Sequence, residues 1–523
     1  MKTDFLVIGS GAAGLSFALK AAAHGHVTIV TKGEMNECNT NYAQGGICSV
    51  TYAPDTFEKH IRDTLVCGAG KCDEAAVELV VKRAPELIRD LIEWGTRFDK
   101  TPDGRFELNR EGGHTEPRIL HHEDLTGAEI ERALVESVRR HPGITVLEHH
   151  FAIDLLTQHH LGKLVKKSTP DITCFGAYVL NLKKHEIYTV LAKITVMATG
   201  GVGNIYHTTT NPAVATGDGI AMVHRAKGAV ENMQFLQFHP TSLYNPGERP
   251  SFLISEAMRG FGALLRLQNG KEFMHKYHPM GSLAPRDVVA RSIDHEMKIS
   301  GDEFVYLDIT HKDPKEVINH FPNIYQKCLS VGIDLTKDMI PVVPAAHYCC
   351  GGVKVNLNGE SSIRHLYALG ETSSTGLHGG NRLASNSLME AAVYADVAAQ
   401  HAISLLNTIE LQRNIPAWDY EGTAIPEEMA LITQNYKEMQ LIMSNYVGIV
   451  RSNLRLERAK RRLEIIFKET EELYLKSTLS QHLCELRNMI AVGYLIIKQA
   501  EAMHESVGLH YSIDYPAKPV NME

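Results

Sequence analysis

The segment that decides the fold of this 523-residue chain is residues 5–14, which read FLVIGSGAAG. The apolar run 5–8 predicts a buried strand, residues 15–23 a helix and residues 27–30 a second strand. A glycine-rich turn between strand and helix is typical of a dinucleotide-binding unit, because the helix N-terminus favours a pyrophosphate. The residues that we expect to contact the phosphates are Gly9, Ser10, Gly11, Ala12, Ala13 and Gly14.

The end of the second predicted strand departs from the pattern of a plain NAD dehydrogenase. That pattern places an acidic residue there to bind a ribose hydroxyl, whereas this chain has Lys32. Lys32 instead suggests a contact to a phosphate. No second full glycine fingerprint marks a separate NAD(P)H site.

Three later segments are candidates for the same nucleotide site. Residues 39–47 combine amides with paired glycines, which suit a planar ring, although a surface loop is the alternative for this stretch alone. Residues 194–201 read as a strand ending in a glycine turn, and residues 366–371 as a strand ending in Gly-Glu. The carboxylate of Glu371 could accept ribitol or ribose hydroxyls. The other candidates are Asn39, Thr40, Ala43, Gln44, Gly45, Gly46, Ala198, Thr199, Gly200 and Gly201.

Length and composition bound the class of protein. The length suggests about three domains, and the net charge of −8 argues against a nucleic-acid binder. The nine cysteines include no C-x-x-C pair, so no metal site is predicted, and free cysteines favour a cytoplasmic location. No segment approaches about 18 consecutive apolar residues, which argues against membrane insertion.

Six further motifs resemble the flavoprotein family of succinate dehydrogenase, fumarate reductase and L-aspartate oxidase, over almost the whole chain. They are YAQGG at 42–46, REGGH at 110–114, QFHPT at 237–241, APRD at 284–287, PAAHY at 344–348 and GNRLASNSL at 380–388. REGGH resembles the aspartate-oxidising branch. The resemblance implies FAD-dependent oxidation of L-aspartate to iminoaspartate, the first step of quinolinate and NAD biosynthesis, with oxygen or fumarate as electron acceptor. Functional coupling to quinolinate synthase is a further implication.

The resemblance also bears on how FAD is held. In the respiratory dehydrogenases of the family a histidine before the Ala-Gln-Gly-Gly stretch carries FAD covalently. Asn39 occupies the matching position here, so the resemblance implies a non-covalent, dissociable FAD. The further cofactor contacts expected are Asp218, Ser385, Asn386, Ser387 and Leu388.

A site for L-aspartate needs cationic donors for two carboxylates. We expect Arg382 to be the main anchor, because a guanidinium group matches a carboxylate with two hydrogen bonds. His239 and His347 would donate from a capping domain, although a hydrogen-bonded core histidine is the alternative for His239. Ser255, where the family has threonine, and Thr241 are weaker candidates.

The remaining candidates concern specificity and proton transfer. Glu111 would attract an ammonium group and repel a third carboxylate, which favours aspartate over succinate. The resemblance makes Arg286 the proton-transfer residue, with Glu256 and Arg259 as its relay. Arginine is a poor base because its pKa is above about 12. Stabilisation of developing charge is therefore the alternative role for Arg286.

We predict an α/β fold with a Rossmann-like FAD-binding domain, an inserted α+β capping domain and a C-terminal helical domain. The expected bounds are 1–232 with 348–416, 233–347, and 417–523. Residues 126–129 predict a helix start with a capping box. The arginine-rich run 451–462 predicts a solvated helix face or an inter-domain contact. The rival functions are a soluble fumarate reductase, a succinate dehydrogenase flavoprotein subunit and a non-catalytic FAD-binding protein.

Overall fold

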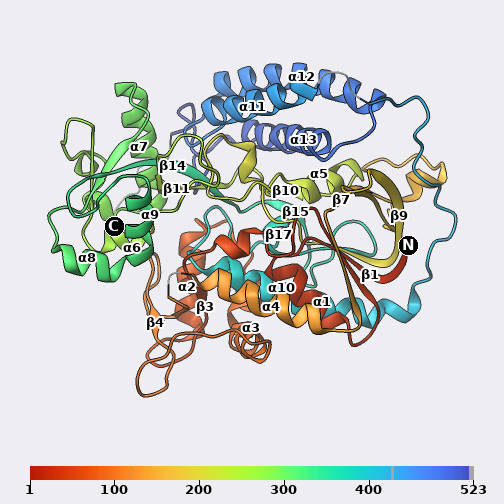
Figure 1. Cartoon of the computed structure of the whole chain (residues 1–523), viewed down its shortest axis with the longest axis horizontal. Helices are drawn as coiled ribbons and strands as arrows, with labels where there is room; N and C mark the ends of the chain where they lie inside the picture. The colour runs from red at the N-terminus through yellow and green to blue at the C-terminus, as the bar shows by residue number, and fades with distance from the viewer. Residues whose placement is uncertain (124, 426–428, 517–523) are drawn as a thin grey trace.

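The computed structural model describes residues 1–123, 125–425 and 429–516, and it contains the three expected parts (Figure 1). A central sheet with helices on both sides forms the body of the molecule. A smaller unit that contains α6 to α9 lies at one end, and three long helices, α11 to α13, lie across one side. The predicted fold class is confirmed by this arrangement.

The central sheet has seven strands among the described residues, in the order β6-β2-β1-β9-β8-β7, with β16 also paired to β9. The strands β6, β2, β1, β9 and β16 are parallel to their neighbours in that set, whereas β7 and β8 form antiparallel pairs. Their bounds are β1 Lys2–Ile8, β2 Val27–Thr31, β6 Ile144–Glu148, β7 His150–Leu155, β8 Gly176–Asn181, β9 Glu186–Met197 and β16 Leu366–Ala368. The strands predicted at 5–8, 27–30, 194–197 and the start of 366–371 therefore all form.

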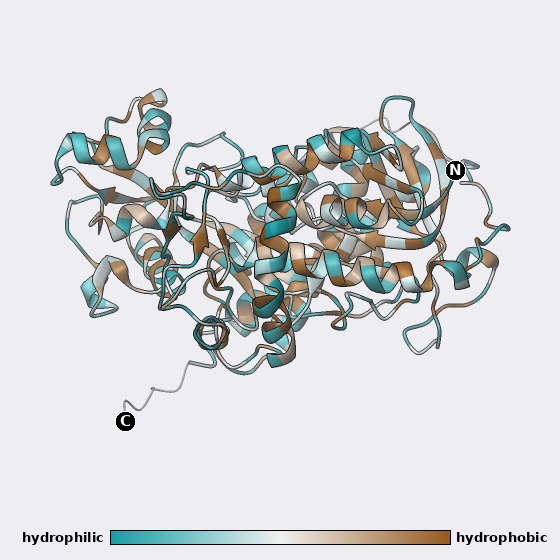
Figure 2. Ribbon diagram, turned by 90° about the horizontal axis from the view of Figure 1, so that it is seen from below, coloured by the Kyte–Doolittle hydropathy of each residue, from teal (hydrophilic) through white to brown (hydrophobic). Residues whose placement is uncertain are grey.

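Strand β1 is apolar on both faces because helices cover both sides of the sheet. Phe5 and Val7 pack into one core with the helices α1, α3, α4 and α10, and Leu6 and Ile8 pack into the other. Figure 2 shows hydrophobic residues gathered on the central strands and mixed residue types on the outer helices. The helices of the FAD-binding part are α1 Ala12–Ala21, α2 Phe57–Cys67, α3 Glu74–Glu93, α4 Thr126–Arg140, α5 Asp218–Arg225 and α10 Asn386–Leu405.

Two small sheets extend the same part. One pairs β10, β15 and β17, and the other pairs β3, β5 and β4. Their bounds are β3 Ile47–Cys48, β4 Leu108–Asn109, β5 Ile119–Leu120, β10 Val230–Glu231, β15 Gly352–Lys354 and β17 Ser373–Ser374. The loop between β4 and β5 carries the REGGH motif, so this small sheet fixes both ends of that loop.

The cap is a four-stranded antiparallel sheet in the order β11-β14-β13-β12, with four helices and a hydrophobic core of its own. Strand β14 is ten residues long and ends at the buried Cys349. The bounds are β11 Leu236–Leu243, α6 Glu256–Gly260, β12 Leu264–Arg266, α7 Arg286–Ser300, β13 Val305–Asp308, α8 Pro314–His320, α9 Pro322–Ser330 and β14 Ile340–Cys349.

The C-terminal part consists of α11 Met429–Tyr446, α12 Asn453–Lys476 and α13 Gln481–Glu501. Residues 426–428 and 517–523 of the predicted C-terminal domain lie outside the described residues. One arginine of the run 451–462 makes an inter-domain contact, and others lie on a solvated helix face. The buried Arg451 donates from Nη1 to Gln234 O, 2.7 Å away, whereas Arg458, Arg461 and Arg462 are exposed on α12.

The predicted capping box at residues 126–129 is wrong, although α4 begins where expected. Thr126 is the first residue of α4 rather than its N-cap, and its Oγ1 accepts from His122 N at 3.1 Å. The carboxylate of Glu129 binds Arg132 and Arg97 N instead of reaching back to the helix start. A sequence match to the box therefore marked the helix but not the bonding of its first turn.

Two further expectations were tested by the structure. All nine cysteines are free. Within the described ranges, no helix is long and apolar enough to span a bilayer.

Candidate active site

One cavity of about 1570 Å³ lies between the central sheet and the cap. It is larger than a typical pocket for a drug-sized ligand, which measures about 300–1,000 Å³. Most of the predicted residues line it, from segments that are far apart in the chain. Those residues are Gly9, Ser10, Gly11, Ala12, Ala13, Lys32, Asn39, Thr40, Ala43, Gln44, Gly45, Gly46, Glu111, Ala198, Thr199, Gly200, Asp218, His239, Ser255, Glu256, Arg259, Arg286, His347, Glu371, Arg382, Ser385, Ser387 and Leu388.

Four predicted residues are not among the lining residues. A Cβ on Gly14 would lie 2.4 Å from Gly9 O, and a Cβ on Gly201 would lie 2.0 Å from a carboxylate oxygen of Glu371, so both glycines allow close packing behind the cavity wall. Thr241 Oγ1 donates to Ile254 O at 2.9 Å. Asn386 begins α10, and its Nδ2 donates to Thr64 Oγ1 at 3.1 Å.

The glycine turn after β1 forms the floor of one end of the cavity. Gly9 has a φ of 110°, and a Cβ there would lie 2.0 Å from Ala198 O, so only glycine fits. Helix α1 has no side-chain cap at Gly11, and Ala12 N donates to Thr40 Oγ1 at 3.0 Å. The start of a helix without a side-chain cap is suited to an anion such as a pyrophosphate.

Glu371 lies at the middle of the cavity wall. Its carboxylate accepts hydrogen bonds from Cys349 N at 3.0 Å and from Asn39 Nδ2 at 2.9 Å. Burial raises the pKa of Glu371 to about 7, and the two donors offset only part of that effect. Asn39 Oδ1 is buried without a hydrogen-bond partner among the described residues. A ligand hydroxyl or N–H group would satisfy it.

Lys32 lines the cavity but is not free for a phosphate. Its Nζ donates to Thr216 Oγ1 at 2.7 Å, to Asp218 at 2.7 Å and to Glu485 at 2.6 Å. Burial would lower the pKa of Lys32, but the two carboxylates raise it above the ordinary value. The predicted phosphate contact therefore differs from what we find, which is an ion-pair cluster that joins the cavity wall to α13. Asp218 takes part in that cluster, and Asn488 Nδ2 also donates to it at 2.7 Å.

Arg382 is the buried cation at the other end of the cavity. Its Nη1 donates to Ser387 Oγ at 3.0 Å and its Nη2 to Gln237 Oε1 at 2.9 Å, and its guanidinium lies 4.5 Å from the ring centroid of Tyr348. Burial lowers the pKa of Arg382, and the positive charge of Arg286 adds to this effect. Arg382 Nε has no hydrogen-bond partner among the described residues. Such a buried cation is suited to bind an anion.

His239 and His347 come from the paired strands β11 and β14, and their ring centroids lie 5.5 Å apart. His239 Nδ1 lies 3.2 Å from Thr241 O and 3.3 Å from Thr241 N, and His347 Nδ1 lies 2.8 Å from Thr210 Oγ1. Burial and neighbouring arginines hold the pKa of both rings well below the usual value. Both histidines are therefore neutral near pH 7.

Arg286 is the first residue of α7, and its Nε donates to Glu256. Arg259 lies behind this pair, with Nη2 3.7 Å from Glu256 and Nη1 donating to Ser282 O at 2.9 Å. Burial would lower the pKa of Arg286, but Glu256 and Glu111 raise it above the usual value. Burial lowers the pKa of Arg259. A raised pKa at Arg286 disfavours the role of a base.

Glu111 and Ser255 complete the lining around these cations. Ser385 Oγ donates to Glu111 Oε2 at 2.6 Å, so the carboxylate is held against the segment that precedes α10. Ser255 precedes α6 as its N-cap residue but makes no side-chain capping bond. Its hydroxyl is therefore not used by the helix.

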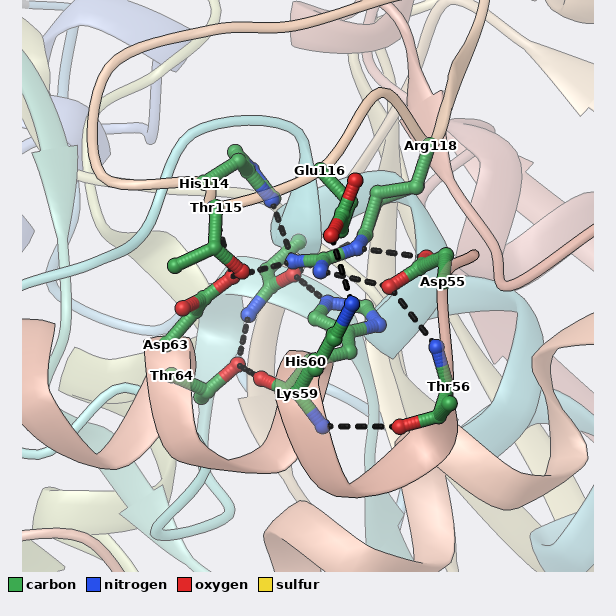
Figure 3. Close-up of polar contacts among 12 residues, drawn as sticks. Asp55, Thr56, Lys59, His60, Asp63, Thr64, His114, Thr115, Glu116 and Arg118 are labelled. Atoms are coloured by element: carbon green, nitrogen blue, oxygen red, sulfur yellow. Dashed lines mark hydrogen bonds and ion pairs between the residues drawn. The ribbon is translucent and has the colours of Figure 1, made fainter. Parts of the chain in front are cut away.

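The residues that hold these groups in place were not predicted from the sequence. A buried cluster under the REGGH loop joins Arg118 to Asp55, Asp63 and His114 (Figure 3). Only His114 was quoted within a motif, and the other three carry no local signal. Thr210 and Glu485 were not predicted either, because each acts on a residue that is distant in sequence, and Gln237 was quoted within a motif but given no role.

The residues present fit FAD together with a small dicarboxylate. Uncapped helix N–H groups, an unpartnered amide oxygen and a buried carboxylate suit the phosphates and hydroxyls of a dinucleotide. Arginines and neutral histidines at the other end suit carboxylates. The described residues contain no group of three or more metal-binding side chains.

Comparisons with known proteins agree with this fit. A family profile described as "FAD binding domain" matches residues 4–388, and one described as "Fumarate reductase flavoprotein C-term" matches residues 436–519. The chain is 47% identical to L-aspartate oxidase of Vibrio cholerae over 98% of this chain and 96% of that protein. It is 45% identical to the chloroplastic L-aspartate oxidase of Arabidopsis thaliana over 98% of this chain and 81% of that protein.

Solved structures give the same grouping. The fold is similar to an E. coli quinol fumarate reductase FrdA variant, with a TM-score of 0.87 and 28% identity over 100% of this chain and 93% of that one. It is similar to Mycobacterium smegmatis Sdh1, with a TM-score of 0.85 and 29% identity over 100% of this chain and 90% of that one.

Proposed function

Since the chain belongs to the L-aspartate oxidase family of FAD-binding flavoproteins, we propose that it oxidises L-aspartate to iminoaspartate with non-covalently bound FAD. The observation that carries this proposal is that one cavity is lined by Arg382, Arg286, His239, His347 and Glu111, with the two imidazole rings 5.5 Å apart. That set matches the two carboxylates and the ammonium group of aspartate. Asn39 supports a non-covalent cofactor, because an amide cannot form the covalent bond that a histidine makes.

Arg382 binds one carboxylate of the substrate in this proposal. Gln237, Ser387 and the ring of Tyr348 fix the guanidinium plane, so little freedom is lost when the carboxylate binds. His239 and His347 donate neutral N–H groups to the carboxylates. Fixing both ends of the substrate removes most of its orientational freedom, which can supply a large part of the rate enhancement.

Glu111 receives the ammonium group of L-aspartate. Succinate has no such group, so binding succinate would leave this carboxylate without a positive partner from the substrate. Glu111 also raises the pKa of Arg286, which keeps that arginine charged. The same carboxylate therefore serves both substrate selection and the charge state of its neighbour.

Bound FAD supplies the chemistry, because its isoalloxazine accepts a hydride from the substrate carbon. Arg286, held by Glu256, stabilises the charge that develops on the substrate carboxylate. A raised pKa keeps Arg286 protonated and makes it both a poor base and a weak acid, so its role in this proposal is electrostatic, with Glu256 and Arg259 behind it.

The wider role follows from the same proposal. Oxygen or fumarate would accept the electrons, and fumarate would bind at the dicarboxylate end. The product would feed quinolinate and NAD biosynthesis, with functional coupling to quinolinate synthase. The free cysteines favour the cytoplasm as its location. We propose the domain bounds 1–232 with 348–416, 233–347 and 417–523, so that the cap closes on the substrate.

Anaerobic bleaching of the purified yellow protein tests the function. L-aspartate should bleach the flavin and succinate should not, and oxygen or fumarate should restore the colour. Bleaching by succinate alone would make the protein a succinate or fumarate enzyme. No bleaching by either acid, with FAD bound, would favour a non-catalytic FAD-binding protein.

A further inference from the structure

We infer that His114, held by the buried Arg118 cluster, is a positioning residue that sets where Glu111 stands relative to Arg382. This deepens the proposed function and rests on it, because it explains how the site would select an amine-bearing dicarboxylate. His114 lines the cavity, but its bonds run to the protein rather than into the cavity.

Glu111 and His114 are the two ends of one tight turn. His114 N donates to Glu111 O at 3.2 Å, and Gly113, the third residue of the turn, has a φ of 88°. Such turns place glycine at the third position because other residues rarely adopt that φ. A displacement of His114 would therefore displace Glu111, because one hydrogen bond and three peptide units connect the two residues.

The turn is fastened to the segment that carries Arg382 at two adjacent points. Ser385 Oγ donates to Glu111 Oε2 at 2.6 Å, and Ala384 O lies 2.9 Å from His114 Nε2. A Cβ on Gly113 would lie 2.7 Å from Leu383 Cδ1, so the turn lies directly against that segment. These bonds fix the spacing between the proposed ammonium acceptor and the carboxylate anchor.

The tautomer of His114 follows from its neighbours. Arg118 Nη1 lies 3.0 Å from His114 Nδ1, and a guanidinium can only donate. Nδ1 must therefore accept, so the ring proton is on Nε2 and donates to Ala384 O. Burial lowers the pKa of His114, and the charge of Arg118 adds to this, so the ring is held neutral in one tautomer.

Arg118 is fixed just as firmly (Figure 3). Its Nε and Nη2 donate to the two oxygens of Asp55 at 2.8 and 2.7 Å, and its Nη1 donates to Asp63 at 2.5 Å. Asp63 also accepts from the N and Oγ1 of Thr115, both at 2.9 Å. Arg118 is fully buried, so these bonds lie in a dry environment where they hold geometry well.

The position of Glu111 matters only for substrates that carry an amine. L-aspartate needs both Glu111 and Arg382 at the right spacing, whereas fumarate needs only the cationic donors. A change that loosens His114 should therefore reduce the use of aspartate and spare the use of fumarate. A residue with a purely structural role would affect both substrates alike.

The test measures two rates on the FAD-loaded protein. One is anaerobic flavin reduction by L-aspartate, and the other is reoxidation of dithionite-reduced flavin by fumarate. For His114→Ala we expect kcat/KM for aspartate to fall about tenfold or more, as for loss of one or two buried hydrogen bonds. The fumarate rate should change less than about threefold. FAD affinity, read by flavin fluorescence, should be unchanged.

Three further variants distinguish a loss of positioning at His114 from misfolding and from an indirect effect. His114→Gln keeps an amide that can donate to Ala384 O, so it should recover most of the aspartate rate. Asp63→Asn leaves the His114 side chain intact but weakens the bonds that hold Arg118, so it should show the same selective loss to a smaller extent. Asp103→Asn, in the exposed turn that precedes β4, should match the wild type.

The outcomes separate this inference from the proposed function. A selective loss with aspartate supports the inference. The inference is overturned if the rates with aspartate and with fumarate fall equally. It is also overturned if His114→Ala or Asp63→Asn shows no fall in the rate with aspartate. If the wild type is bleached by succinate and not by L-aspartate, the proposed function itself fails, whatever the variants show.

Discussion

Replacing Arg382 by lysine separates the shape of the cation from its charge. The guanidinium is held by hydrogen bonds of 2.9 and 3.0 Å to Gln237 and Ser387 and by stacking 4.5 Å from the centroid of Tyr348. Lysine keeps the positive charge but offers a single point donor, which neither stacks nor binds a carboxylate with two hydrogen bonds. The variant therefore removes one of two bonds to the substrate.

The expected fall in kcat/KM follows from the removal of one hydrogen bond to the substrate. A hydrogen bond to a charged group contributes about 1.5–3 kcal/mol, and about 1.4 kcal/mol is a factor of ten. We expect kcat/KM for flavin reduction by L-aspartate to fall about 10- to 150-fold in Arg382→Lys. Fumarate should suffer a similar loss, because it uses the same carboxylate anchor.

Stopped-flow spectroscopy of the anaerobic flavin band measures both rates. Arg461→Lys on the exposed face of α12 is the matched control and should behave as the wild type. A loss below about threefold would refute the assignment of Arg382 as the anchor. A loss confined to aspartate would also refute it, since it would place Arg382 at the amine end.

Three other changes probe separate parts of the molecule. In Glu111→Gln the rate with L-aspartate should fall about tenfold or more while the fumarate rate is kept; comparable losses in both assays would remove Glu111 as the ammonium acceptor. Glu485→Gln leaves Lys32 with one carboxylate partner, so urea unfolding should show a loss of about 1.5–3 kcal/mol, while Glu472→Gln, from the exposed pair with Lys476, should leave the stability as in the wild type. Burial raises the pKa of Glu131 from 4.5 to about 8, so between those values the folded chain holds a proton that the unfolded chain has released, and stability should fall as the pH rises. Glu131→Gln should remove this contribution and be more stable than the wild type at pH 8 but not at pH 4.5; equal stabilities at pH 8 would contradict the raised pKa.

Much of the fold could be predicted because its signals are local. The run of buried residues in β1, the glycine turn and α1 follow one another within 21 residues, so periodicity and glycine placement are enough. The wrong capping box at Thr126 shows the limit, since a helix start was predicted but the bonds of its first turn depend on residues outside it.

The site could be predicted only where a motif named its members. Arg382, His239 and His347 were found through the family resemblance, whereas their residue types alone left a core histidine equally plausible for His239. Lys32 was expected to bind a phosphate. No sequence pattern shows that Glu485 lies 2.6 Å from its Nζ. Partners separated by hundreds of residues become visible only when the chain is folded.

The order of strands in the central sheet has a consequence for biosynthesis. Strand β9 pairs with β16, and α10 covers α1, yet residues 198–365 are made between β9 and β16. At about 5–20 residues per second, translation of that stretch takes roughly 10–30 s. Throughout this interval the apolar surface of α1 and part of the edge of β9 are exposed to solvent on the ribosome-bound nascent chain. The nascent chain is therefore expected to need chaperone protection then, so that yield in a cell depends on chaperone supply as well as on the stability of the finished protein.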